Sequence, residues 1–137
     1  MIDIRLAEPG EAGALLELWQ AAGSSPSNTD NIESVTAAIE WVGTWVLVAE
    51  SAGVIVGSLI ATWDGWRGNM YRLAVRPEHQ RRGIATALLD EGERLLRERG
   101  ARRVSAVVLF EEPPAVAFWE QAGYALQPEA RRFTKVV

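Results

Sequence analysis

The chain has 137 residues, of which 48% are hydrophobic and 23% are charged, as in one soluble globular domain. Its 14 basic and 18 acidic residues give a formal charge of −4, which argues against a nucleic-acid binder that neutralises phosphates. The lack of cysteine excludes a disulfide framework, a thiolate nucleophile and a cysteine-based metal site. No apolar run resembles a signal peptide or reaches membrane-spanning length, so we expect a cytoplasmic protein.

The first forty residues predict a strand and two helices. Ile2–Leu6 alternates like a short strand, and Pro9 suits the first turn of the helix that follows. A second helix is expected after a polar loop, with Asp30 as its cap and Glu33 completing a capping box. The apolar face of this second helix carries Ile32, Val35, Ile39 and Val42.

A hairpin and a central strand follow. Thr44–Glu50 and Val54–Trp63 predict the two hairpin strands, and Asn69–Val75 predicts the central strand. The loop between Val54–Trp63 and the central strand begins with Asp64-Gly65, an ordinary turn pair. Because the loop adjoins the central strand, Asp64 and Arg67 are also candidates for substrate contact.

A basic turn that contains glycine ends the central strand and begins a long helix. The turn reads Gln80-Arg81-Arg82-Gly83-Ile84-Ala85. Backbone N–H groups at a helix start lack intrahelical acceptors, and together with the helix dipole they favour a bound phosphate. Gly83 allows an anion to approach the backbone, Ala85 keeps the same face open, and Arg81 and Arg82 add positive charge.

The last third of the chain predicts three strands and one helix. Gly100 ends the long helix, and Arg103–Leu109 reads as a strand. A helix is expected from Pro113, a further strand from Tyr124, and a last antiparallel strand over Arg132–Val137.

The string from Val75 to Ala85 resembles the acetyl-CoA signature of the GNAT superfamily of N-acetyltransferases, Gln/Arg-x-x-Gly-x-Gly/Ala. Gln80, Gly83 and Ala85 occupy its three defining places. The resemblance implies that backbone N–H groups of the turn bind the pyrophosphate of acetyl-CoA, while the central strand pairs with its pantetheine arm. The implied cofactor-binding residues are Leu73, Ala74, Val75, Gln80, Arg81, Arg82, Gly83, Ile84, Ala85, Thr86, Phe118 and Trp119.

A second string, from Glu112 to Tyr124, is similar to the GNAT motif Asn-x-x-Ala-x-x-hydrophobic-Tyr-x-x-x-Gly-Phe. Here Glu112 replaces the usual Asn, and Trp119 replaces a Tyr whose hydroxyl often protonates the departing sulfur of CoA in the family. An indole N–H is too weak an acid for that step. Water, the helix dipole, the Trp119 N–H as a donor, or the hydroxyl of Tyr71 are the alternatives.

The resemblance implies a mixed α/β GNAT fold that covers nearly the whole chain as a single domain. Its twisted, mostly antiparallel sheet lies between helices, with a V-shaped opening for pantetheine between the strands Met70–Val75 and Val104–Leu109. The implied activity is direct transfer of an acetyl group from acetyl-CoA to a primary amine of a small molecule or protein, without a metal. The backbone N–H of Val75 would stabilise the oxyanion.

The general base is left open by the sequence. The family often places a Glu in the central strand, where this chain has Asn69. The remaining candidates are Asp64, Glu111 and Glu112. His79, the only histidine, adjoins the phosphate turn, where it would meet solvent or CoA rather than the amine.

Three further alternatives remain. A catalytically inactive acyl-CoA sensor with the GNAT fold would explain Trp119 and the missing central-strand Glu. Nucleic-acid binding through the arginines at 76, 81 and 82 is disfavoured by the net charge. Trp41 and Trp45 could line an acceptor pocket or pack in the core. If Trp41 or Trp66 is exposed, it could serve a pocket or a homodimer interface.

Overall fold

The computed structural model describes residues 1–108 and 113–137, and of Pro113 only the backbone. The chain divides into two compact units, Met1–Ala106 and Val107–Val137, and each is described by itself. The predicted single domain stays a prediction. None of the helices in the described ranges is long and apolar enough to cross a membrane.

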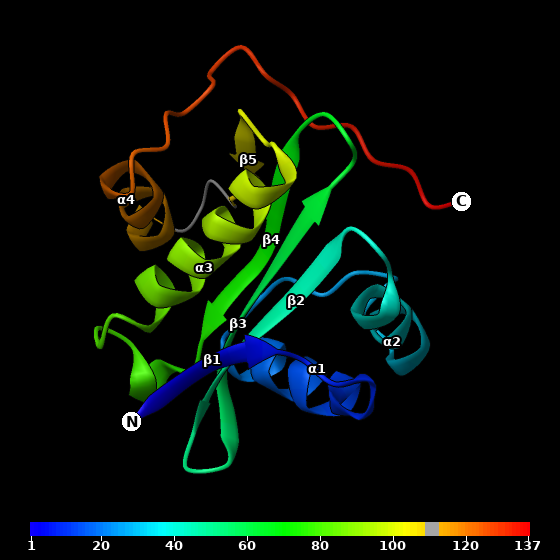
Figure 1. Ribbon diagram of the computed structural model, residues 1–137, viewed down its shortest axis with the longest axis vertical. Coiled ribbons are helices and arrows are strands. Elements are labelled where there is room, and N and C mark those ends of the chain that lie inside the picture. Colours follow the sequence, from blue (N-terminus) through cyan, green and yellow to red (C-terminus); the bar gives the residue numbers. More distant parts are fainter. Residues whose placement is uncertain (109–112) are drawn as a thin grey trace. The chain divides into compact units, whose positions relative to one another are not determined.

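The first unit is a five-stranded sheet with helices on both faces (Figure 1). The strand order is β1-β2-β3-β4-β5, antiparallel except for the parallel pair β4 and β5. The elements are β1 (Ile2–Leu6), η1 (Pro9–Glu11), α1 (Ala12–Ala21), α2 (Ile32–Glu40), β2 (Thr44–Ser51), β3 (Val54–Trp63), β4 (Gly68–Val75), η2 (Pro77–His79), α3 (Ile84–Arg99) and β5 (Val104–Ala106). The predicted mixed α/β, mostly antiparallel architecture is confirmed.

Helix α3 packs closely on one face of the sheet because small residues lie at the contact. A Cβ atom on Gly92 would lie 2.9 Å from Leu59 and 3.1 Å from Met70, so only glycine fits there without a shift. Gly68 lies against Leu96 in the same way, at 2.8 Å. The long helix that begins at the basic turn is therefore fixed directly over β3 and β4.

Helices α1 and α2 pack on the opposite face, over alternate residues of the same strands. The buried residues of this core are Ala12, Leu15, Leu18, Trp19, Val35, Val46, Val48, Ile55 and Ala74. One polar contact lies within it: the indole N–H of Trp19 donates to the hydroxyl of Ser58, at 2.8 Å. This bond satisfies the buried indole and links α1 to the middle of β3.

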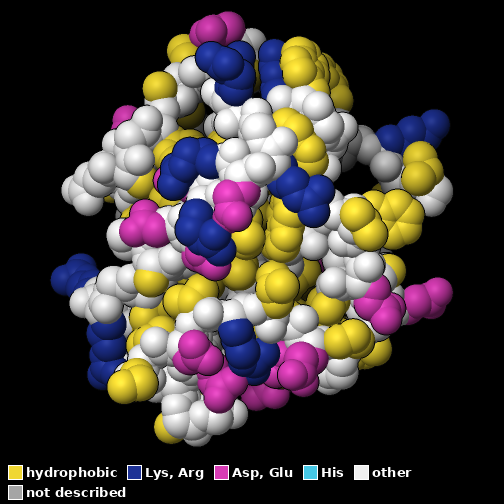
Figure 2. All heavy atoms as spheres, viewed as in Figure 1, with side chains coloured by type: hydrophobic (Ala, Val, Ile, Leu, Met, Phe, Trp, Pro, Cys, Tyr) yellow, Lys and Arg dark blue, Asp and Glu magenta, His cyan; other side chains and the backbone are white. Residues whose placement is uncertain are grey.

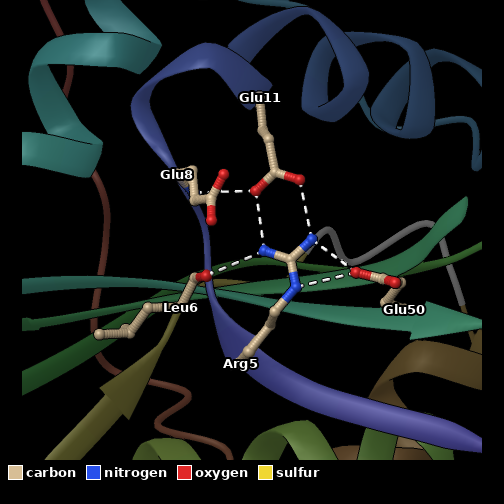
Figure 3. A network of polar contacts seen from close by, with 5 residues as sticks. All are labelled: Arg5, Leu6, Glu8, Glu11 and Glu50. Atoms are coloured by element: carbon tan, nitrogen blue, oxygen red, sulfur yellow. Dashed lines mark hydrogen bonds and ion pairs between the residues drawn. The ribbon is translucent and has the colours of Figure 1, made fainter. Parts of the chain in front are cut away.

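An ion-pair network holds β1 to the start of α1 and to β2 (Figure 3). The guanidinium of Arg5 makes two hydrogen bonds of 2.8 Å to Glu11 and also contacts Glu50 at 2.7 Å. The Glu8 backbone N–H donates to Glu11 as well. Hydrogen bonding to Arg5 lowers the pKa of the Glu11 carboxyl to about 2.

The cap of helix α2 lies one residue later than predicted, so the predicted role of Asp30 is wrong. Asn31 is the cap, and its side-chain oxygen accepts from the backbone N–H of Ser34 at 2.8 Å. Val42 was expected on the helical face, but it follows the end of α2 and is 84% exposed. Trp41 is the C-cap and has extended backbone, which ends the helical spacing before Val42.

The second unit contains α4 (Pro113–Gln121), which confirms the helix predicted from Pro113. The strand predicted over Arg103–Leu109 is shorter, since β5 covers Val104–Ala106 and residues 107–108 are not in a strand. The strands predicted from Tyr124 and over Arg132–Val137 are wrong, because residues 124–137 form neither strand nor helix. A segment forms a strand only where another strand is available for pairing.

Candidate active site

Strand β4 contains a β-bulge in its middle. Ser58 pairs with Ala74 and Ile60 with Tyr71, so the single residue Leu59 lies opposite two residues of β4. Those two are Arg72 and Leu73, and Arg72 has a φ of +55°. A positive φ is uncommon and unfavourable for a residue with a Cβ atom, so neighbouring contacts must hold it there.

Contacts from three other elements hold the bulge. The hydroxyl of Ser58 donates to the carbonyl oxygen of Arg72 at 2.8 Å and accepts from Trp19. The guanidinium of Arg72 donates to Asp30 at 2.8 Å and lies over the Trp19 ring, 4.9 Å from its centroid. The sequence alone does not indicate this network, because its members are 14 to 42 positions apart and share no motif.

The carboxyl half of β4 extends past the end of β5. The parallel pairing joins Gly68–Met70 to Val104–Ala106, and within the described residues Tyr71–Val75 have no β5 partner. The Arg76 N–H donates to the Val56 carbonyl at 2.8 Å, so it points to β3. Neighbouring residues of a strand direct their backbone groups to opposite edges, so the N–H of Val75 points to the edge that β5 leaves open.

The turn after β4 is tied back to this edge. The side-chain amide of Gln80 donates to the Val75 carbonyl at 3.2 Å, which confirms that this carbonyl points away from β3. Arg81 and Gly83 then have left-handed backbone, with φ of +63° and +79°. A Cβ atom on Gly83 would meet no atom within 4 Å, so open space lies in front of the turn.

Helix α3 begins at this turn without a capping side chain. Its first intrahelical bond runs from the N–H of Ala87 to the carbonyl of Gly83, at 3.0 Å. The N–H groups of Ile84, Ala85 and Thr86 therefore have no acceptor in the described part of the chain. Free amides, the positive end of a sixteen-residue helix and open space at a glycine together suit an anion.

His79 lies in η2, directly before the turn, as the sequence indicated. Its Nδ1 atom is buried and has no hydrogen-bond partner within the residues that the structure describes. Arg76, one residue before η2, directs its guanidinium to the Ile55 carbonyl at 3.4 Å and to Glu17 at 3.5 Å. Its charge is therefore partly satisfied by the protein itself.

The candidate base Asp64 has a structural use in the β3–β4 loop. One of its oxygens accepts from the backbone N–H groups of Trp66 and Arg67, at 2.8 and 2.7 Å. These bonds, led by that of Arg67, lower the pKa of this exposed carboxyl below its usual range. Arg67 itself lies over the Trp66 ring, 3.9 Å from its centroid.

The remaining candidate side chains, those of Tyr71, Trp119, Glu111 and Glu112, lie in different parts of the chain. Tyr71 is 40% exposed and, as the partner of Ile60, shares the sheet face covered by α1 and α2. In the second unit the Trp119 ring meets Phe118 and Tyr124 edge-on, at 5.7 and 4.8 Å between centroids. Glu111 and Glu112 lie outside the described residues. No cluster of His, Asp or Glu that suits a metal ion occurs in the described ranges.

Residues 14–124 match the model of the acetyltransferase (GNAT) family. The chain belongs to the GNAT family. An acetyltransferase of Sodalis glossinidius is 38% identical over 81 residues, which cover 59% of this chain and 57% of that protein. An acetyltransferase of Pectobacterium atrosepticum is 29% identical over 123 residues, 90% of this chain and 87% of that protein. The chain thus spans little more than half the length of the first relative.

The fold of this GNAT protein is also that of solved acetyltransferases. The aminoglycoside N-acetyltransferase AAC(6')-Iy, in complex with a bisubstrate analogue of CoA and acetylneamine, superposes with a TM-score of 0.81 at 16% identity. The match covers 100% of this chain and 99% of that one. The predicted GNAT resemblance is therefore confirmed for both sequence and fold.

Proposed function

We propose that this GNAT protein transfers the acetyl group of acetyl-CoA to a primary amine of a small molecule or protein. The observation that carries the proposal is the place of the anion-binding turn. Free amides and the open space at Gly83 directly follow the β4 edge to which the Val75 N–H points. A diphosphate attached to an extended amide-containing arm fits such an arrangement.

The cofactor would lie along this surface in two parts. Its pyrophosphate accepts from the amides of Arg81–Thr86, with Arg81 and Arg82 at the rim. Its pantetheine amides pair with the backbone of Leu73–Val75, as a strand adds to a sheet edge. Known complexes of AAC(6')-Iy hold CoA or a CoA-based analogue, which supports CoA as the ligand of this fold. The family resemblance adds Phe118 and Trp119 to the contacts.

The reaction is direct nucleophilic transfer. The neutral amine nitrogen bonds to the thioester carbonyl carbon, and the Val75 N–H donates to the oxyanion that forms. The carbon–sulfur bond then breaks, and CoA leaves with the electron pair as a thiolate. Because a thiol has a pKa of about 8.5, its thiolate can leave without full protonation. The replacement of the usual Tyr by Trp119 therefore slows this step rather than preventing it. The proton of the attacking amine passes to a base or to water.

Among the three nominated carboxylates, the contacts of Asp64 favour a structural role. Its lowered pKa makes it a weaker base, and its oxygen already accepts two backbone N–H groups. Glu111 and Glu112 stay candidates. A lysine-like amine is neutral in only about one molecule in 2,500 at pH 7, so a base would contribute substantially to the rate.

Charge distribution supports a small-molecule or protein acceptor over nucleic acid. On the face seen in Figure 2, basic and acidic side chains are interspersed, and no continuous basic surface appears. Along α3, Arg94 pairs with both Glu91 and Glu98. Trp41 and Trp66 are 71% and 70% exposed. Both side chains therefore stay candidates for an acceptor pocket or a homodimer interface.

Calorimetric titration with acetyl-CoA, followed by a free-thiol assay, tests the proposal. The amine panel contains spermidine, kanamycin and a peptide with an N-terminal alanine. Binding with thiol release that depends on an amine is the expected result. Binding of acetyl-CoA without thiol release in the presence of any amine would favour the alternative function, an acyl-CoA sensor. The replacement of the usual Tyr by Trp119 is the observation that favours this alternative. Failure to bind acetyl-CoA would contradict both.

A further inference from the structure

The arginines of the first unit fall into two groups. Arg5, Arg72, Arg76, Arg94 and Arg97 each form an ion pair with a carboxylate. The ion pairs within the described residues include none of the others, which are Arg67, Arg81, Arg82, Arg99, Arg102 and Arg103. Two of these lie in the turn proposed to bind phosphate. The other four gather at the opposite end of β4.

Three chain connections lie at that end of the sheet: residues 41–43 before β2, residues 64–67 before β4, and residues 100–103 before β5. The Trp63 N–H donates to the Gly43 carbonyl at 2.8 Å, which places the first connection beside the end of β3. The Gly68 N–H donates to the Arg103 carbonyl at 3.0 Å, which places the third beside the start of β4 (Figure 1). Neighbouring strands are about 4.8 Å apart, so the three connections lie side by side within about 15 Å.

These connections expose large apolar side chains. Trp41 and Val42 are 71% and 84% exposed, and Trp66 is 70% exposed. Close by, the guanidinium of Arg99 lies over the Trp45 ring, 5.2 Å from its centroid. Exposed apolar residues that occur singly are ordinary, but a group of them marks an interaction site. Trp and Arg are also the residue types that contribute most to protein–protein interfaces.

The same end of the sheet is basic. The three connections, with the residue on either side of each, contain four arginines and two carboxylates, those of Glu40 and Asp64. One oxygen of Asp64 already accepts two backbone N–H groups of its own loop. Arg99, Arg102 and Arg103 are exposed. A chain with a formal charge of −4 therefore has a positive, tryptophan-rich end.

Two other occupants fit this end less well. A two-fold contact between copies would bring the arginines of one copy against those of the other, and like charges repel. Single-stranded nucleic acid stacks its bases on free aromatic faces, but the Arg67 guanidinium covers a face of the Trp66 ring, 3.9 Å from its centroid. The net charge of −4 also repels nucleic acid.

We propose that this end of the sheet, the Trp–Arg surface, binds an acidic segment of another protein. The surface consists of Trp41, Val42, Trp66, Arg99, Arg102 and Arg103. Carboxylates of the partner pair with the three arginines, and its apolar side chains pack on the two tryptophans and the valine. The cofactor turn lies past the other end of β4, roughly 25 Å along an eight-residue strand, so this binding is independent of the proposed acetyl transfer.

Fluorescence anisotropy tests the proposal with a labelled peptide that alternates Glu with Leu and Phe. The unaltered protein should bind this peptide saturably, with a Kd below about 100 µM at low salt. Added salt should weaken the binding, because salt screens exposed charges. A peptide with Lys in place of Glu, and one with Ser in place of Leu and Phe, should each bind at least about tenfold more weakly.

Variants of exposed residues locate the site. Trp66→Ala should weaken peptide binding at least about tenfold, as expected for an aromatic residue at the centre of an interface. The double variant Arg102→Ala/Arg103→Ala should weaken it by about tenfold and reduce its salt dependence. The matched control, Arg81→Ala/Arg82→Ala, removes the same charge at the other end of β4 and should change the Kd for the peptide by less than about twofold.

Four results would overturn the proposal. The first is the absence of saturable peptide binding up to about 1 mM. The second is an equal loss in Arg81→Ala/Arg82→Ala, which would show that net charge alone matters. Tighter binding of labelled oligothymidylate than of the peptide would assign the surface to nucleic acid. Self-association in sedimentation equilibrium that Trp66→Ala abolishes would assign it to a second copy of the chain.

Discussion

The side-chain amide of Gln80 donates to the carbonyl of Val75, with 3.2 Å between nitrogen and oxygen. This bond joins the two parts of the proposed cofactor site, the open edge of β4 and the turn before α3. Gln80→Ala should weaken acetyl-CoA binding about 2- to 10-fold, as expected from the loss of one hydrogen bond worth roughly 0.5–1.5 kcal/mol. Calorimetry with Gln20→Ala, at an exposed site on α1, provides the control. Equal affinities in both variants would count against the role of this bond.

Asp64 is expected to stabilise its loop rather than to accept the amine proton. Asp64→Ala removes two backbone contacts of 2.8 and 2.7 Å and should lower the free energy of unfolding. Asp64→Asn keeps an oxygen acceptor and should cost less. Neither variant should change the pH profile of kcat/KM. Loss of turnover in Asp64→Asn without loss of stability would instead identify Asp64 as the base.

Trp119→Tyr should raise kcat, because a phenol hydroxyl can protonate the departing sulfur where an indole cannot. A positioned general acid contributes on the order of 10²–10⁴ in rate, and an introduced one should recover at least about tenfold. Trp119→Phe is the control, since Phe has the same ring as Tyr but no hydroxyl. Equal rates in the two variants would show that protonation of the sulfur does not limit turnover.

The Arg5 network predicts a specific loss of stability in acid. Because the pKa of Glu11 is about 2 in the folded protein against an ordinary value of 4.5, its carboxylate stabilises the fold above pH 4.5. That contribution is lost as pH falls from about 4.5 towards 2. Glu11→Gln should therefore be less stable at pH 7 and show a flatter pH dependence over this range in denaturant titrations.

Glu17→Gln is the control for this effect. Glu17 is 74% exposed and lies 3.5 Å from Arg76, so solvent screens the pair. Its removal should leave both the stability at pH 7 and the acid-induced loss close to those of the unaltered protein. The same flattening in both variants would contradict a special contribution from Glu11.

Local patterns predicted the first unit well. The spans Ile2–Leu6 and Val54–Trp63 are strands as expected. The first is a short alternating segment, and the second is an apolar run whose middle, Ile55–Leu59, is buried between the helices on the two faces of the sheet. Gly100 ends α3 with a φ of +104°, a conformation that glycine adopts readily. The proposed anion-binding turn could likewise be identified from the sequence, since it consists of six consecutive residues.

Contacts between distant residues could not be predicted. Asp30 and Asn31 are both good capping residues; Asn31 is the cap, whereas Asp30 accepts from Arg72, 42 positions away. The bulge at Arg72 likewise depends on Ser58 and Trp19, which no spacing rule connects. Residues 124–137 form no strand, and their own sequence could not reveal this, because strand pairing is a property of two segments.

Titration of acetyl-CoA into the unaltered protein, Gly83→Glu and Gly100→Glu tests the central proposal most directly. Both glycines have left-handed backbone at an end of α3, and a Cβ atom would meet no atom within 4 Å at either. The two substitutions therefore cost similar backbone strain, but only the one at Gly83 puts negative charge into the proposed phosphate site. One molecule bound per chain in the unaltered protein and in Gly100→Glu, with loss of at least about 100-fold in Gly83→Glu, is the predicted result. Unchanged affinity in Gly83→Glu, or no binding by the unaltered protein, would contradict it.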